Sequence, residues 1–253
     1  MNTIACYKVV PDAQDIGVNA DGTLNFDKAR MILGEYDLMA IEAAVSLAEA
    51  TDGKAMLLTV GDESLQDSKL IKAALSRGAA ELYSVIDPAL ASADAFQTAS
   101  VLAAALDKID CDLVICGEGS ADLYAQQVGT LLGALAGLPV VNSVGKLEEQ
   151  DGTLIVERVL EHEIEVLEAS LPAVVSVTTD INLPRIPQMR DILAAGKKPH
   201  TIWSLADLGD LPASPVETVS TKAPESVERK HIVFESDAQE NIDELVSQIR
   251  ALG

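Results

Sequence analysis

Two glycines, a serine and an aspartate follow a short apolar run near the middle of the chain, and together they could hold an anion. Gly117 and Gly119 let a ligand approach the main chain closely, and the Ser120 hydroxyl can donate a hydrogen bond. A helical pattern follows, and the first N–H groups of a helix attract phosphate. The segment therefore predicts a phosphate cradle. An ordinary turn with Asp122 as the helix N-cap explains the same residues equally well.

The cradle does not match the dinucleotide fingerprint Gly-x-Gly-x-x-Gly, because Asp122 stands where the third glycine belongs. A second turn, Val60-Gly61-Asp62, also follows an apolar run and precedes a helical pattern. If the strands that end at Val60 and Gly117 are neighbours where the strand order reverses, both turns line one crevice. The alternative for the second turn is a plain loop.

Residues that could catalyse a reaction are sparse. His162, His200 and His231 are scattered, and the sequence has no Gly-x-Ser-x-Gly, His-Glu-x-x-His or Walker lysine motif. A conventional hydrolase or kinase is therefore disfavoured. The three cysteines lie in apolar runs without Cys-x-x-Cys spacing, which favours buried thiols over disulfides or a metal site.

Composition limits the function classes further. The chain has 253 residues, of which 48% are hydrophobic, and its formal charge of −22 would repel a nucleic-acid backbone. Its first residues have no basic region before a long apolar run, and no stretch approaches 18 uncharged apolar residues. We expect a soluble, unprocessed, cytoplasmic protein with no nucleic-acid partner and no membrane insertion.

Apolar runs of strand length alternate with helical patterns through the first two thirds of the chain, which predicts an α/β fold with a doubly wound, mostly parallel sheet. The predicted strands are residues 3–10, 54–60, 82–86, 112–116, 140–144 and 173–177. The predicted helices are residues 36–50, 64–76, 93–109 and 125–136. Gly78 and Gly137 suit the left-handed position after a helix.

Two hairpins and a C-terminal arm interrupt this rhythm. An Asp21-Gly22 turn predicts a hairpin after the first strand, and residues 153–159 with 163–168 predict another. After Leu183 prolines punctuate the chain until a helical pattern at residues 238–252. Such an arm buries too little surface to fold alone, so we expect it to wrap its own core or a second chain.

Taken together, these segments resemble the beta subunit of electron-transfer flavoproteins along nearly the whole chain. The resemblance rests on several stretches: Cys6 to Asp12, Tyr36 to Val45, Val156 to Arg158 with Glu165 to Leu167, Leu171 to Val175, and Asn182 to Pro187. Asp122 to Gly129 and Asp180 to Asn182 resemble most the FixA type, which is associated with anaerobic carnitine or acyl-CoA metabolism.

The resemblance implies an adenine-nucleotide site at the strand ends. Its residues would be Cys6, Gly34, Val60, Gly117, Gly119, Ser120, Asp122, Gln126, Gln127 and Val128. Many relatives carry Asn-Pro where this chain has Gly34-Glu35, so a backbone contact from Gly34 would replace a side-chain contact. The ligand would be FAD, with AMP as the alternative, and a flavin would supply the redox chemistry.

The resemblance also implies a partner-recognition segment. Arg185, Arg190, Lys197 and Lys198 surround Met189 in an otherwise acidic chain. By the resemblance Met189 would anchor a dehydrogenase of the acyl-CoA type, because methionine packs adaptably and the cations speed encounter. The alternative is that Met189 packs within its own helix.

The resemblance thus implies an electron carrier rather than a conventional enzyme. It would pair with an alpha subunit as a heterodimer and pass electrons between NADH or a dehydrogenase and another flavoprotein, with flavin-based bifurcation as one mode. Residues 1–183 would form the nucleotide-binding domain, 184–199 the partner-recognition segment and 200–253 an arm on the alpha subunit. The alternative function is an adenine-nucleotide sensor without a redox role.

Overall fold

A computed structural model describes residues 1–150, 152–225 and 231–251 of the chain. The chain divides into two compact units. The first comprises residues 1–17 and 25–220, and the second comprises residues 18–24 and 221–253.

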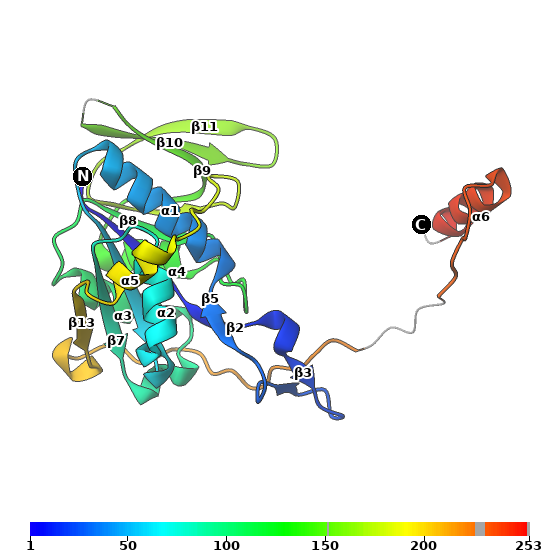
Figure 1. The fold of residues 1–253 in the computed structure, drawn as a ribbon, viewed down its shortest axis with the longest axis horizontal. Helices are drawn as coiled ribbons and strands as arrows, with labels where there is room; N and C mark the ends of the chain where they lie inside the picture. Colours follow the sequence, from blue (N-terminus) through cyan, green and yellow to red (C-terminus); the bar gives the residue numbers. More distant parts are fainter. Residues whose placement is uncertain (151, 226–230, 252–253) are drawn as a thin grey trace. The chain divides into compact units, whose positions relative to one another are not determined.

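Nine strands of the described chain form one sheet, and its strand order is β11-β10-β9-β12-β8-β1-β6-β7-β13 (Figure 1). In that order the strands are Ile164–Ala169, Thr153–Val159, Val140–Gln150, Ala173–Val177, Leu113–Gly117, Thr3–Cys6, Ala55–Gly61, Glu81–Ile86 and His200–Trp203. Neighbours from β9 to β13 pair in parallel, whereas β10 pairs antiparallel with both β9 and β11. The predicted mostly parallel sheet with an extra hairpin is confirmed.

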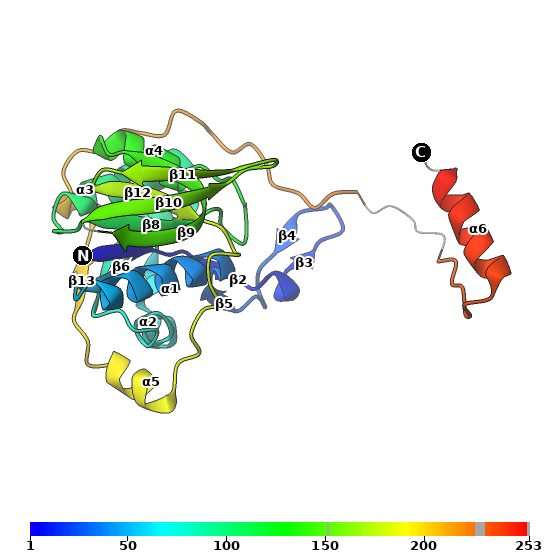
Figure 2. The ribbon, with the colours of Figure 1, turned by 90° about the horizontal axis from the view of Figure 1, so that it is seen from above.

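Helices cover both faces of the parallel part, as Figure 2 shows, with α1 and α2 on one face and α3 and α4 on the other. The helices are α1 (Glu35–Ala50), α2 (Ser68–Leu75), α3 (Ala95–Leu106), α4 (Val128–Ala136), α5 (Met189–Ala195) and α6 (Gln239–Arg250). The two faces follow from the alternation of side chains along a strand. In β1, Ala5 joins the core under α1, whereas Ile4 and Cys6 join the core under α3 and α4.

Several boundaries differ from those predicted. The predicted strand 3–10 divides at Tyr7 and Lys8, because Val9–Pro11 (β2) leaves the large sheet and pairs antiparallel with Met31–Leu33 (β5). The predicted helix 64–76 overlaps a short 3-10 turn, Glu63–Gln66 (η2), before α2 begins at Ser68. The predicted helix 93–109 contains α3 and follows another 3-10 turn, Pro88–Ser92 (η3). Further 3-10 turns are Ala13–Asp15 (η1) and Leu205–Asp207 (η4).

The glycine predicted to end α4 has the expected conformation, since Gly137 has a φ of 68°. Gly78 also has a positive φ, of 111°, but it follows the end of α2 at Leu75 by three residues. The sequence did not predict the edge strand β13 or the short helix α5. Both lie in the proline-punctuated stretch, where the apolar period is too short to identify an element.

The second unit contains the helix predicted near the C-terminus. Helix α6 begins at Gln239 and ends at Arg250, and the predicted end at residue 252 lies outside the described residues. Its four apolar side chains, Ile242, Leu245, Val246 and Ile249, are all exposed. The hairpin predicted around Asp21-Gly22 is present as β3 (Gly17–Val18) and β4 (Leu24–Asn25). Within the described residues, no helix is long and apolar enough to cross a membrane.

Candidate functional site

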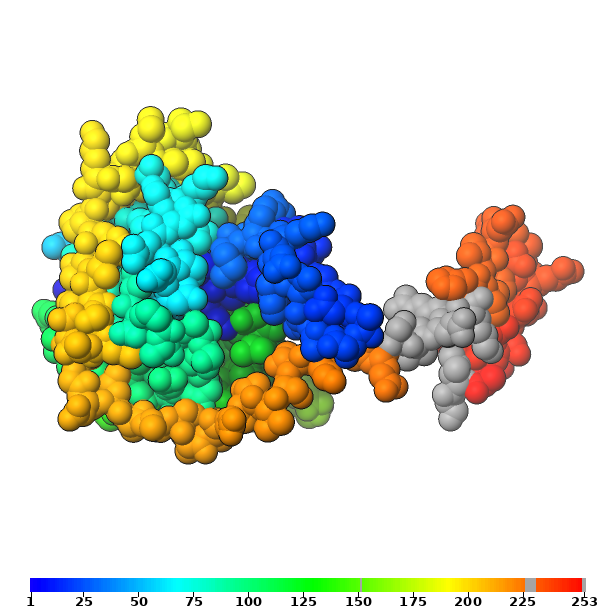
Figure 3. Space-filling model, turned by 90° about the horizontal axis from the view of Figure 1, so that it is seen from below, coloured from blue at the N-terminus to red at the C-terminus, as the bar shows by residue number. Residues whose placement is uncertain are grey.

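The strand order reverses at β1, which places three strand ends at one edge of the sheet. From β1 the chain adds β6 and β7 on one side and later β8 on the other. The condition that the strands ending near Val60 and Gly117 are direct neighbours is not met, because β1 lies between them. Figure 3 looks at this edge, where dark-blue and green segments lie recessed between their neighbours. Ligands of open α/β sheets bind at such a reversal.

An ion pair joins the turn after β1 to the loop after β8. The Lys8 Nζ lies 2.6 Å from Asp122 Oδ2. Burial alone would raise the pKa of Asp122, but hydrogen bonds from Lys8 and Ser120 outweigh it and hold that pKa below its ordinary value. Asp122 is therefore a charged partner of Lys8. The alternative role as helix N-cap is wrong, because α4 begins six residues later and its N-cap is Gln127.

A buried carboxylate, Asp37, lies in the first turn of α1 between the two loops. Its side chain is 7% exposed, and its Oδ2 accepts a hydrogen bond of 2.7 Å from the Lys8 main-chain N–H. Gly34 and Gly117 pack against it so closely that a Cβ atom would lie 2.7 Å from Oδ2 at Gly34 and 2.8 Å from Oδ1 at Gly117. Both positions therefore require glycine.

Burial raises the pKa of Asp37 to about 7, although the Lys8 N–H and the Lys8 charge oppose the shift. The negative charge of Asp122 adds to it. Burial also raises the pKa of Tyr7, which stays a neutral phenol beside Asp37. The edge of the sheet therefore holds a carboxyl group that changes its charge near neutral pH.

A contact between two tyrosine rings joins the loop after β8 to α1. The rings of Tyr36 and Tyr124 lie with their centroids 5.1 Å apart, tilted by 42°. A Cβ atom at Gly119 would lie 2.6 Å from the Tyr124 ring, so glycine is required there too. Tyr124 and Gln126 have positive φ angles of 46° and 56°, which non-glycine residues rarely adopt. Such backbone strain is common at ligand-binding sites.

Helix α4 then begins without a side-chain cap. Gln126 and Gln127 are exposed, and Val128 is half-buried. The free N–H groups of the first turn and the positive helix end face the loop that the sequence analysis identified as a phosphate cradle. Gly129 lets this end approach the sheet, since a Cβ atom there would clash with the Ser176 hydroxyl.

Cys6 and Val60 offer only their main chains to this edge. The Cys6 side chain is buried among the residues under α3, and a hydrogen bond with Cys116 together with burial raises the pKa of its thiol. Val60 packs against the same group of residues. The loop residues and Gly34 therefore lie together at one edge of the sheet. The side chains of Cys6 and Val60 point away from that edge.

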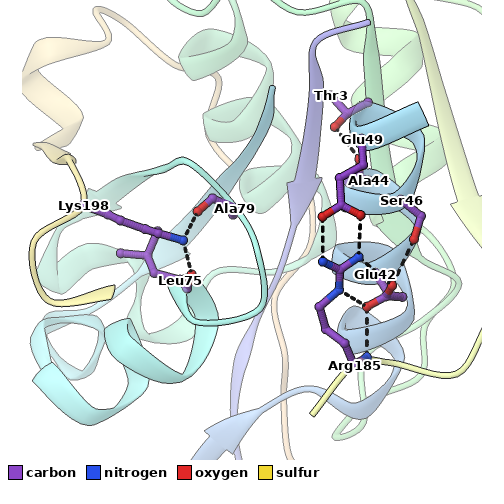
Figure 4. A network of polar contacts seen from close by, with 9 residues as sticks. All are labelled: Thr3, Glu42, Ala44, Ser46, Glu49, Leu75, Ala79, Arg185 and Lys198. Carbon is purple, nitrogen blue, oxygen red and sulfur yellow. Dashed lines mark hydrogen bonds and ion pairs between the residues drawn. The ribbon is translucent and has the colours of Figure 1, made fainter. Parts of the chain in front are cut away.

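The predicted partner-recognition segment is held by charge against α1 (Figure 4). Arg185 makes a bidentate pair with Glu49, at 2.8 and 3.0 Å, and three hydrogen bonds to Glu42. Those bonds to Glu49 and Glu42 raise the pKa of Arg185. The Arg77 guanidinium donates to the Arg185 carbonyl at 2.9 Å. Arg185 therefore fixes the segment to its own chain.

Lys198 fixes the other end of the segment. Its ammonium donates to the main-chain oxygens of Leu75 and Ala79, at 2.8 and 2.5 Å, and burial lowers its pKa (Figure 4). Between these anchors Met189 is 72% exposed, which does not fit the alternative of a side chain packed within its own helix. Leu193 is exposed as well, and the side chain of Arg190 is 80% exposed.

Two open hollows lie elsewhere on the described surface. One of about 710 Å³ adjoins α5, and another of about 450 Å³ lies between α1 and β9. The first is lined by Leu193, Ala194, Lys197, Lys198 and Pro199. No group of three His, Cys, Asp or Glu side chains among the described residues could hold a metal ion.

A comparison with known families shows which family the chain belongs to. The model of the electron transfer flavoprotein domain matches residues 21–208, about three quarters of the chain. The chain belongs to the electron transfer flavoprotein family. Its place in electron transport follows from that membership, and a flavin cofactor is consistent with it.

Sequence reasoning missed several residues of this electron transfer flavoprotein domain that complete the edge. Lys8, Tyr36, Asp37 and Tyr124 contact the predicted loop or its neighbours, yet none was assigned a role in the site. One signal was available, because Asp37 is an acid within a largely apolar helix. The residues suit the phosphate groups of a nucleotide, since they offer main-chain groups and an uncapped helix end.

Proposed function

We propose that this chain is the beta-type subunit of an electron-transfer flavoprotein, of the FixA type, and that it holds the adenylate of FAD. AMP is the alternative ligand. The loop from Gly117 to Val128, with Gly34 and the main chains at Cys6 and Val60, binds the phosphates. The observation that carries the proposal is the convergence of these segments where the strand order reverses.

When bound, the flavin supplies the redox chemistry. The chain's own residues then have three tasks. Main-chain N–H groups at the start of α4 hold the phosphates. When the nucleotide binds, the Ser120 hydroxyl and the Lys8 ammonium turn from Asp122 to the phosphates, where Ser120 donates a hydrogen bond and Lys8 offsets negative charge. The paired rings of Tyr36 and Tyr124 hold the loop in place on α1.

Partner docking is the second part of the proposal. An alpha subunit completes the heterodimer, and Met189 anchors an acyl-CoA dehydrogenase-type flavoprotein with Arg190 and Lys197 beside it. Arg185 and Lys198 serve this surface by fixing its two ends. In functional terms, residues 1–183 bind the nucleotide, 184–199 recognise the partner and 200–253 contact the alpha subunit.

Co-expression with an alpha-type subunit tests the proposal. We expect a yellow heterodimer that accepts electrons from NADH or a reduced dehydrogenase and passes them to a flavoprotein acceptor. A homodimer that carries AMP or ATP and no flavin would instead support a nucleotide sensor. A stable, colourless monomer that binds no flavin with its partner present would refute the proposal.

A further inference from the structure

We propose that Ile186 is a second apolar anchor of the partner-recognition segment, and that Arg77 is the positioning residue that holds this anchor in place. Ile186 lies on the surface at which Met189 is proposed to dock a dehydrogenase, so the inference rests on the proposed function. Arg77 lies outside the segment, in the turn after α2.

Ile186 exposes an apolar side chain that the fold does not bury. It is 90% exposed, and Met189 is 72% exposed. Because the two residues are three positions apart, their Cα atoms lie within about 11 Å of each other, which is well inside one protein–protein interface. Both side chains can therefore contact the same partner.

The main chain before Ile186 is fixed on both sides of Arg185. The Arg185 N–H donates to Glu42 Oε2 at 2.9 Å (Figure 4), and the Arg185 carbonyl accepts from Arg77 Nη1 at 2.9 Å. Leu183 is as exposed as Ile186, but its main-chain groups bond to none of the described residues. Ordering Leu183 on docking would cost conformational entropy that Ile186 has already lost on folding. Ile186 is therefore preorganised as an anchor.

The surroundings of Arg77 indicate a positioning role. The bond to the Arg185 carbonyl is the only hydrogen bond of its guanidinium to the described residues, and its buried Nε donates to no acceptor among them. Glu42 attracts Arg77, but that carboxylate is already bonded to Arg185. A half-buried cation with an unmet donor stabilises a fold poorly. The main contribution of Arg77 is therefore the position that it gives to Arg185 and to the residue that follows.

The charges beside Ile186 indicate the chemistry of the partner. Arg190 and Lys197 are exposed cations of the same segment, although the whole chain carries a formal charge of −22. Two apolar anchors beside exposed cations complement an apolar cleft with an acidic rim. The occupant is therefore the acyl-CoA dehydrogenase-type flavoprotein of the proposed function, and Ile186 and Met189 enter its cleft together.

Steady-state kinetics of the heterodimer with an acyl-CoA dehydrogenase, reduced by its own acyl-CoA substrate, tests the anchor. Ile186→Ala should raise the KM for the heterodimer about tenfold and leave kcat unchanged, because the truncation weakens docking without touching the redox centre. The matched control Ile164→Ala removes an exposed isoleucine from the edge strand β11 and should leave the KM unchanged. An unchanged KM for Ile186→Ala would overturn the inference.

A double-mutant cycle tests whether Arg77 acts through Ile186. Arg77→Met should raise the KM about threefold in the unmodified chain and by less than about 1.5-fold in an Ile186→Ala chain, because an absent anchor cannot be displaced. Arg77→Lys should recover part of the loss, since its ammonium can donate to the same carbonyl, and it replaces Arg77→Met in the cycle if that variant does not fold. Equal effects of the Arg77 substitution in both chains would overturn the positioning role.

Met189→Ala separates the inference from the proposed function. If Met189→Ala raises the KM and Ile186→Ala does not, the docking surface stands and the second anchor is wrong. If the unmodified heterodimer takes no electrons from the reduced dehydrogenase, the proposed docking function itself is refuted.

Discussion

At the scale of single residues, Asp37 couples the charge of the sheet edge to pH. Its pKa is raised to about 7 in the folded chain, so folding favours the neutral form. The stability that it contributes is fully present below the unfolded-state pKa near 4 and is lost as the pH rises through about 7.

The substitution Asp37→Asn should remove this pH dependence. Between pH 5.5 and pH 8.5 the free energy of unfolding of the unmodified chain should fall relative to that of the variant, by on the order of 2 kcal/mol. Urea denaturation of both chains at several pH values measures the difference. Two curves that stay parallel across this range would show that Asp37 is not the group responsible.

The residue scale also shows where sequence reasoning reached its limit. Gly117, Gly119 and Ser120 are recognisable because their types and spacing are local. The contacts of Asp37 and Lys8 are not recognisable, because they depend on strands that are distant in sequence and adjacent only after β8 joins β1. The cations of Arg185 and Lys198 suggested a free basic surface, because local sequence does not show the groups that they contact. Their partners lie more than 100 residues away along the chain.

At the scale of elements, the segment around α5 depends on Arg185 for its position. Arg185→Met should remove the pairs with Glu42 and Glu49 and destabilise the chain by about 1–3 kcal/mol, because two carboxylates lose a shared partner. Amide hydrogen exchange should rise over residues 183–196. Denaturation and hydrogen exchange together check both effects.

A matched control lies five residues away. Arg190→Met removes a cation whose side chain is 80% exposed and whose only described ion pair is a 3.5 Å contact with Asp191. We expect a change within about 0.5 kcal/mol and no change in exchange over the segment. Equal effects of the two substitutions would show that Arg185 does not position the segment.

Elements with a strong apolar period were predicted well, and those without one were not. The buried strands β6, β8 and β12 are mostly apolar runs, which identifies them directly. Strands β5 and β13 are only three and four residues long, and their pairing partners lie elsewhere in the chain. Local sequence cannot specify such pairs, because the register is set by the tertiary fold.

At the scale of the whole molecule, the two units should contribute differently to stability and assembly. The second unit contains α6, whose four apolar side chains are exposed, so removing it exposes little buried surface. Deleting residues 224–253 should lower the Tm of the isolated chain only slightly and should weaken heterodimer formation strongly. Thermal unfolding and size-exclusion chromatography with the alpha subunit measure both. Equal losses would make the arm part of the core.

If main-chain groups at the reversal of strand order bind an adenylate, the purified heterodimer should carry it. Mass spectrometry of the released ligands should find one adenine nucleotide for each copy of this chain, in addition to the FAD of the alpha subunit. The second ligand is FAD by the preferred proposal and AMP by its alternative. A heterodimer that releases one FAD and no further adenine nucleotide would show that this chain has no adenylate site.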